Sequence, residues 1–353
     1  MLTTEISPPD AHTRAALRFD RIMAGLTVWL IGGLFLDGWA HHHLPDLESF
    51  ITPWHGVFYS GFLVMTVFLV GSAARSWRSK PVAAQAEAST GIRRLFERSA
   101  SLLPAGYEFA LIGVLVFWAG GVGDFIWHTL FGVEVDVEAL LSPTHLLLAF
   151  GMSLMVVSPV RAAWNRASGQ GARASWVESW PSIVAYTGLL SLATFFTQFA
   201  NPIVESWAYG ATPGISAAFA QEFGAASLIL TAMIITGAVL IAQSGRWPFG
   251  AMTVMLTANA AALSVFDDAY LLIPAGLLAG MAADLIRSRL AANVFVLAIT
   301  VPAIFVASVL GILGIAGHLD WSIHLWAGAV VMAAVFGGLL ALVARRPRER
   351  AVP

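Results

Sequence analysis

The sequence predicts an all-α fold, a polytopic bundle of about ten transmembrane helices, and its composition and hydrophobic pattern support this prediction. Of the 353 residues, 58% are hydrophobic and only 11% are charged, whereas an ordinary soluble domain carries about 25% charged residues. The apolar residues form long continuous runs instead of the short alternating segments of a transmembrane barrel. This pattern excludes a soluble enzyme, and the net charge of −2 indicates no nucleic-acid partner.

Each predicted span is an apolar run of about 20 residues, the length that crosses the hydrocarbon core of a lipid bilayer. The ten runs cover residues 20–40, 53–75, 105–128, 143–162, 180–200, 215–243, 247–266, 269–286, 291–314 and 322–344. We expect residues 1–353 to form a single transmembrane domain. The residues before the first run lack the features of a removable signal peptide, so we expect the first helix to be an uncleaved anchor.

The basic residues predict the orientation in the membrane. With ten spans, all 19 Lys and Arg residues fall on one side of the bilayer, and basic residues are retained on the cytoplasmic side. We therefore expect a multi-pass protein of the plasma (bacterial inner) membrane whose N- and C-termini are both cytoplasmic.

The opposite side of the predicted bundle collects histidines and acidic residues. Eight of the nine His residues fall there, all except His12. The positive-inside rule explains the missing Lys and Arg, but it does not explain the gathering of imidazoles. The outer end of the bundle is therefore where we expect a functional site.

An internal repeat supplies the candidate residues. Residues 32–61 and 119–151 match as a helix, a short outer loop and a returning helix, within repeat copies of about 20–75 and 105–165. The remainder, 176–344, is a degenerate continuation. The equivalent pairs are Gly33 and Gly120, Asp37 and Asp124, His41 and His128, Glu48 and Glu138, Pro53 and Pro143, His55 and His145, and Gly61 and Gly151.

Each copy brings one Asp and two His residues toward one point. Asp37 and His41 are four residues apart, so they share one face of a helix. Thr52 and Pro53 have the residue types of an N-cap and a first helical position, which places His55 at the start of the returning helix. The positive helix N-terminus disfavours the imidazolium ion, and neutral imidazole is the form that binds metals.

The second copy repeats this pattern with Asp124, His128 and His145, after a predicted cap at Ser142. The sequence therefore predicts metal ligation by six residues, namely Asp37, His41, His55, Asp124, His128 and His145. The alternative is that each Asp and His simply hydrogen-bond to each other and cap a helix end. No catalytic residue can be named from the pattern.

Five further residues are weaker candidates for the metal site because they lie at the outer level without a shared helical face. They are Glu48, Glu138, His318, Asp320 and His324. We expect His42 and His43 to be solvated loop residues, and Gln198 and Glu205 to serve mainly as loop and capping residues.

The spacing of Asp37, His41 and His55 resembles the metal motif of the C subunit of copper membrane monooxygenases. That resemblance covers some 20 residues in each copy and implies copper and an oxygenase activity. The longer motifs, DGWAHHH…TPWH and GDFIWHTLFG…SPTH, are similar to those of uncharacterised bacterial polytopic membrane proteins. Here the motif occurs twice in one chain, unlike in the copper-dependent subunit.

We expect an integral membrane metal-binding protein, foremost a metal-dependent enzyme with its site at the extracytoplasmic face. His and carboxylate ligands suit copper, zinc, iron or manganese, and the absence of Cys excludes thiolate sites. The substrate would be a small membrane-soluble or extracytoplasmic molecule, and the lipid bilayer is the expected surrounding partner. The alternatives are a transporter or metal-handling permease, and a haem- or quinone-binding protein.

Overall fold

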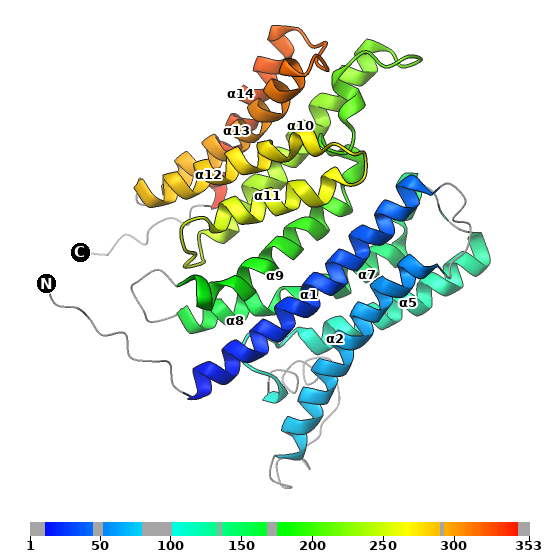
Figure 1. Ribbon diagram of the computed structural model, residues 1–353, viewed down its shortest axis with the longest axis vertical. Coiled ribbons are helices and arrows are strands. Elements are labelled where there is room, and N and C mark those ends of the chain that lie inside the picture. Colours follow the sequence, from blue (N-terminus) through cyan, green and yellow to red (C-terminus); the bar gives the residue numbers. More distant parts are fainter. Residues whose placement is uncertain are drawn as a thin grey trace, which may run out of the picture.

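A computed structural model describes residues 11–44, 52–79, 101–132, 134, 136–167, 175–289 and 293–344. Within these ranges the chain consists of helices and their connections, with no strand (Figure 1). The prediction of an all-α polytopic bundle is confirmed. The long helices run roughly side by side.

Each predicted apolar run coincides with one helix or with a pair of consecutive helices. The α-helices of the described residues are α1 (Ala11–His43), α2 (Pro53–Arg78), α5 (Ala110–Phe131), α6 (Asp136–Leu141), α7 (Pro143–Val156), α8 (Ser158–Ala167), α9 (Trp176–Phe195), α10 (Ala217–Ala242), α11 (Ala251–Ser264), α12 (Ile273–Arg289), α13 (Val294–Ile315) and α14 (Ile323–Ala344). Three short 3₁₀ segments, η1 (Gln198–Ala200), η2 (Ser206–Tyr209) and η3 (Tyr270–Leu272), lie in the connections.

Eight helical segments of the described chain are long and apolar enough to cross a membrane, which supports a multi-pass membrane protein. The two remaining predicted spans are α9 and α11. The first turn of helix α9 contains Glu178, which forms a capping box with Ser175, and 12 of its 20 residues are buried. Helix α11 has 14 residues, so at 1.5 Å per residue it is about 21 Å long, shorter than the hydrocarbon core of about 30 Å. The full count of ten spans and the orientation of the termini stay predictions.

The two repeat copies fold as helical hairpins, α1 with α2 and α5 with α7. Their glycines explain how closely the helices approach. A Cβ on Gly33 would lie 2.8 Å from Phe58 Cα, and one on the equivalent Gly120 would lie 3.0 Å from Leu148 N. Phe58 and Leu148 are themselves equivalent positions of the repeat, so the two hairpins pack in the same way.

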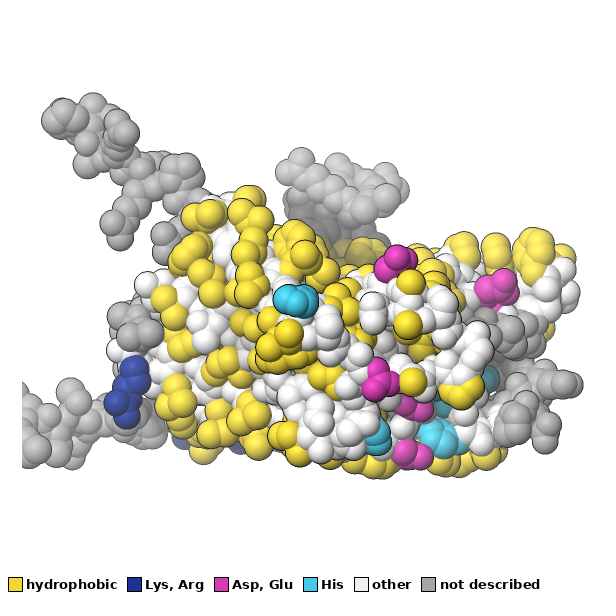
Figure 2. Space-filling view, turned by 90° about the horizontal axis from the view of Figure 1, so that it is seen from above, with side chains coloured by type: hydrophobic (Ala, Val, Ile, Leu, Met, Phe, Trp, Pro, Cys, Tyr) yellow, Lys and Arg dark blue, Asp and Glu magenta, His cyan; other side chains and the backbone are white. Residues whose placement is uncertain are grey.

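Helix α9 links the two hairpins to the rest of the bundle, because it packs against α1, α7 and α8 on one side and against α10 and α11 on the other. Helices α12, α13 and α14 complete the second half. Figure 2 shows the Lys and Arg side chains in view at one end of the molecule, whereas the Asp, Glu and His side chains in view lie over the middle and the opposite end. The separation of charge predicted from the sequence is therefore visible on this face of the fold.

One expectation about the first hairpin was wrong. His42 and His43 do not lie in a loop, because α1 continues through His43. The imidazole of His42 stacks on Phe266, with ring centroids 5.0 Å apart, and His43 Nδ1 lies 2.9 Å from the carbonyl oxygen of Trp39. Both residues thus belong to the end of the helix, although His42 is exposed and His43 is partly exposed.

Candidate metal centre

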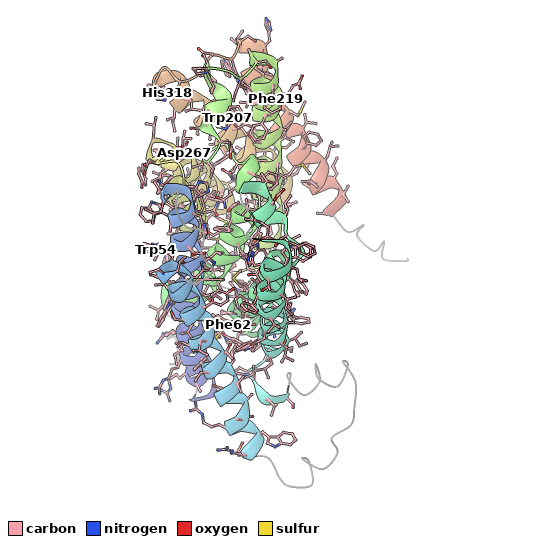
Figure 3. All side chains as sticks on the ribbon, turned by 90° about the vertical axis from the view of Figure 1, so that its right-hand side faces the viewer. Trp54, Phe62, Trp207, Phe219, Asp267 and His318 are labelled. Carbon is pink, nitrogen blue, oxygen red and sulfur yellow. The ribbon has the colours of Figure 1, made fainter. Side chains whose placement is uncertain are left out.

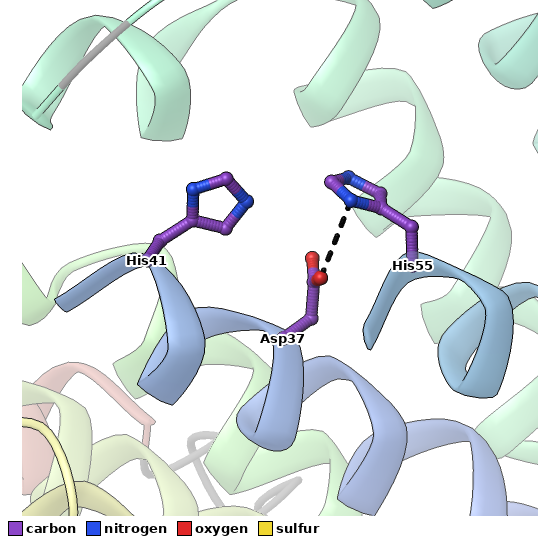
Figure 4. A group of neighbouring side chains, drawn as sticks. All are labelled: Asp37, His41 and His55. Atoms are coloured by element: carbon purple, nitrogen blue, oxygen red, sulfur yellow. Dashed lines mark ion pairs between the residues drawn. The ribbon is translucent and has the colours of Figure 1, made fainter. Parts of the chain in front are cut away.

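The first hairpin brings Asp37, His41 and His55 together as the repeat predicts (Figure 4). Asp37 Oδ1 lies 3.3 Å from His55 Nδ1. The ring of His41, one turn after Asp37, has its centroid 5.5 Å from that of His55. Each residue offers one ligand atom, and the three atoms lie within 4.8 Å of one another.

The caps that begin the returning helices position the histidines. The side chain of Thr52 accepts a hydrogen bond from the backbone N–H of His55 at 3.1 Å, with Pro53 in the first turn. The side chain of Ser142 accepts the equivalent bond from His145 at 3.3 Å. Both predicted N-caps are confirmed, so each histidine is held at the first turn of its helix by local chemistry.

The second hairpin gathers Asp124, His128 and His145, again with ligand atoms within 4.8 Å of one another. Asp124 is buried and bridges the two imidazoles, with Oδ1 3.2 Å from His145 Nε2 and Oδ2 3.5 Å from His128 Nε2. Thr144 donates a hydrogen bond of 2.9 Å to Asp124 Oδ1. One carboxylate from α5 is thus contacted by side chains from both helices of its hairpin.

Glu134 is a site residue that the sequence analysis missed. Its Oε2 lies 3.0 Å from His128 Nδ1, and its side chain is 10% exposed. It follows His128 by six residues in the connection to α6, outside the repeated motif, and it has no acidic counterpart at the equivalent position of the first copy. Its acidic side chain on the outer side was the only available signal.

Both groups of residues face the same cavity, which has a volume of about 480 Å³. Five of the six candidate ligands line it, and the buried Asp124 lies directly behind His128 and His145. The apolar part of the lining is formed by Leu34, Phe58, Val137, Ala139, Leu140, Leu148, Met152, Phe195, Phe196 and Phe199.

The two groups also interact across the cavity. His41 of the first hairpin and His145 of the second are close enough for an electrostatic interaction. The same holds for His55 of the first hairpin and Asp124 of the second. The two hairpins therefore contribute to one continuous polar region and not to two isolated helix caps.

The segment between α9 and α10 adds polar residues to the cavity wall. Gln198 and Glu205 line it, as does His42 at the end of α1. Burial raises the pKa of the Glu205 carboxyl, and the hydrogen bond that it accepts from the Trp207 indole opposes this shift. These residues were expected to be loop, capping or solvated residues, and only the tertiary fold places them at the cavity.

The weaker candidates do not join either group within the described residues. Glu48 lies outside these residues, and Glu138 is exposed on α6. His318, Asp320 and His324 are exposed around the connection between α13 and α14 and do not line the cavity. Figure 3 shows His318 well apart from Trp54 at the start of α2.

Comparisons with models of known protein families, with curated proteins and with solved structures found no match.

Proposed function

We propose that this integral membrane protein is a metal-dependent enzyme that binds divalent transition-metal ions at its two Asp–His groups and acts on a small molecule held in the cavity between the hairpins. The observation that supports this most is the shared cavity, because both groups face it and the rest of its lining is largely apolar. A metal pair placed only for stability would not need an open space of about 480 Å³ beside it.

The charge balance of the second hairpin favours a bound cation. Asp124 is 1% exposed, and a buried carboxylate within a membrane bundle is costly unless it is paired, coordinated or protonated. Among the described residues, its ion-pair partners are imidazoles and not Lys or Arg. A divalent cation bound by Asp124, His128 and His145 would supply the missing positive charge.

The donor set narrows the choice of metal. Imidazole and carboxylate ligands suit copper, zinc, iron and manganese, whereas the absence of Cys disfavours metals that select thiolates. Three protein ligands leave one or more coordination positions open to water or substrate. At such a position the bound metal would activate water or dioxygen, or polarise a substrate oxygen.

In this proposal the protein residues bind the metal, orient the substrate and shield both from bulk water. The apolar wall, which includes Phe58, Phe195 and Phe199, excludes bulk water from a substrate in the cavity. The imidazoles hold the metal at one side of the same space. Glu205, Gln198 and His42 provide polar groups at the wall, where they are placed to orient a polar part of the substrate.

Metal analysis of the full chain tests the proposal. Protein purified without chelator should contain a transition metal by plasma mass spectrometry, and His55→Ala and His145→Ala should each lower the metal content per protein. His324→Ala is the matched control, because His324 is exposed and outside the cavity, and it should retain wild-type content.

Folded wild-type protein that takes up none of the four metals after removal and re-addition would contradict the proposal, and the Asp–His pairs would then be structural caps. A Soret band in the visible spectrum would redirect the assignment to a haem protein. Metal uptake that is coupled to movement of the ion across sealed vesicles would favour a metal-handling permease over an enzyme.

A further inference from the structure

We propose that the two Asp–His groups are unequal metal sites, that the group of Asp124, His128 and His145 is the tighter one, and that Glu134 is the positioning residue that makes it so. This inference rests on the proposed metal-binding function and deepens it. By the sequence repeat alone the two copies are equivalent, whereas their contacts in the fold differ.

In the second group, the distances from Asp124 to the two imidazoles are close to those between ligands of one metal ion. Two ligands that each lie about 2.1 Å from an ion are about 3.0–3.4 Å from each other at octahedral or tetrahedral angles. The distances from the Asp124 oxygens to His145 Nε2 and His128 Nε2 are 3.2 and 3.5 Å. An ion can therefore be bound with little movement of these side chains.

The second group also has a partner behind each imidazole. Nδ1 of His145 lies 2.9 Å from Ser142 Oγ. Nδ1 of His128 lies 3.0 Å from Glu134 Oε2 and 3.2 Å from the carbonyl oxygen of Gly132. The carbonyl oxygen of Gly132 is within hydrogen-bond distance of Nδ1 of His128, whereas the Glu134 carboxylate lies at ion-pair distance and makes no hydrogen bond. The negative charge of Glu134 and the carbonyl both favour a proton on Nδ1, which leaves the Nε2 lone pair for the metal, as carboxylates and carbonyls do for metal-binding histidines.

The first group lacks this arrangement. His55 turns Nδ1, not Nε2, toward Asp37, and the same nitrogen lies 3.0 Å from the hydroxyl oxygen of Thr52. The nitrogen that faces the carboxylate is therefore shared with the helix cap. His41 is exposed, so its ring is held by fewer neighbours than that of His128.

One sequence difference between the copies also makes the surroundings of Asp124 and Asp37 unlike. Thr144 donates a hydrogen bond to Asp124, whereas the equivalent position of the first copy is Trp54, which has no hydroxyl. Asp37 Oδ1 is buried and makes no hydrogen bond. Binding at the first group requires more reorganisation of its side chains, and preorganised ligands bind more tightly.

Titration of the metal-free full chain in detergent with Co²⁺ tests the inequality, because the visible ligand-field bands of Co²⁺ report the geometry of its ligands. Wild-type protein should bind Co²⁺ in two classes that differ at least about tenfold in affinity. Asp124→Asn should remove the tighter class, and Asp37→Asn should remove the weaker one. His145→Gln provides a second, independent removal of the tighter class should Asp124→Asn fail to fold.

The role of Glu134 is tested with Glu134→Gln in the same titration. The affinity of the tighter class should fall about 10–100-fold, and its Co²⁺ spectrum should shift, while the weaker class stays unchanged. Glu138→Gln is the matched control, since Glu138 is an exposed carboxylate in the same connection. Gel filtration and thermal unfolding of each variant establish that it is folded.

Two classes of equal affinity, or loss of the tighter class in Asp37→Asn, would overturn the inequality while leaving the proposed metal function intact. A Glu134→Gln variant with wild-type affinity and spectrum would overturn the role of Glu134. Folded wild-type protein that binds no Co²⁺ at all would instead contradict the proposed function itself.

Discussion

At the scale of the residue, the Asp124 carboxylate is the central contact of the second Asp–His group. Its two oxygens contact His145 and His128, and Thr144 donates a hydrogen bond to one of them. The carboxylate is buried and fixed by residues from both helices of its hairpin. The position of this oxygen pair, more than the number of histidines, decides whether the second group can bind an ion without rearrangement.

Replacing Thr144 by Val should lower the metal affinity of the second group about two- to tenfold. Val has the same shape but no hydroxyl, and one hydrogen bond of this kind contributes about 0.5–1.5 kcal/mol. Titration with Co²⁺ measures the change. Thr129→Val is the control, because the Thr129 hydroxyl on α5 donates to the backbone carbonyl of Phe125 and not to Asp124. Equal affinities in the two variants would show that Thr144 does not hold the carboxylate.

A second buried carboxylate stabilises the other half of the bundle. Asp284 on α12 accepts hydrogen bonds from the backbone N–H of Thr253 at 2.9 Å and from its hydroxyl at 2.7 Å. It thereby satisfies donors in the first turn of α11. The carboxylate thus ties the start of α11 to α12, the helix against which it packs most extensively.

Asp284→Ala should destabilise the fold without affecting metal content. Each buried donor left without a partner costs about 1–3 kcal/mol, so the unfolding temperature in detergent should fall by several degrees. Asp320→Ala, at an exposed position, should leave the unfolding temperature near that of the wild type. A wild-type unfolding temperature in the Asp284→Ala variant would show that water or another group replaces the carboxylate.

At the scale of the element, the helical hairpin is the repeated unit, and close helix packing aligns its ligands. Gly61 of α2 and Gly151 of α7 are equivalent positions. A Cβ on Gly61 would lie 3.1 Å from the backbone of Leu30, and one on Gly151 would lie 2.6 Å from Phe117 N and 2.9 Å from Phe117 Cα. Small residues permit such approach in membrane bundles. The distance between the helices in turn sets the distance between the Asp on one and the His on the other.

Gly151→Ala should therefore separate α5 from α7 and weaken both the hairpin and its metal site. The contact is with backbone atoms, which cannot rotate away, so we expect a loss of about 1–3 kcal/mol in stability together with reduced metal affinity. Thermal unfolding and Co²⁺ titration measure the two effects. Gly25→Ala is the control, since no atom lies within 4 Å of its added Cβ and Ala favours a helix by about 1 kcal/mol. Similar behaviour of the two variants would contradict the role of close packing.

At the scale of the whole molecule, the distribution of charge predicts the orientation in the membrane. The Lys and Arg residues lie at the side opposite to the two Asp–His groups in a ten-span arrangement. The eight clearly apolar helices leave α9 and α11 to be established as spans. The chain has no Cys, so single cysteines can be introduced without background labelling.

Cysteine accessibility in intact cells tests this orientation. Asp46→Cys should react with a membrane-impermeant thiol reagent from outside, and Thr90→Cys should react only after the membrane is permeabilised, because the positive-inside rule keeps its Arg-rich segment in the cytoplasm. Labelling of Thr90→Cys from outside would contradict the ten-span arrangement.

What the sequence determined by itself is local. Apolar runs of helical length predict the helices, a spacing of four residues predicts that Asp37 and His41 share a face, and Thr52 and Ser142 predict the caps. Each of these depends only on residues close in the chain, where backbone geometry dictates the outcome. The helix limits differ most at the start of α1, which begins at Ala11 and not at residue 20, because a helix continues beyond the apolar run that crosses the bilayer.

Only the tertiary structure decided what the two hairpins do together. The facing of both Asp–His groups onto one cavity, the contact of Glu134 with His128, and the placement of Gln198 at the cavity wall depend on how separate helices pack. The same packing places His318 and His324 elsewhere, although their residue types matched a metal site. Helix packing is set by the summed contacts of many side chains over the whole bundle, and no short spacing in the sequence encodes that sum.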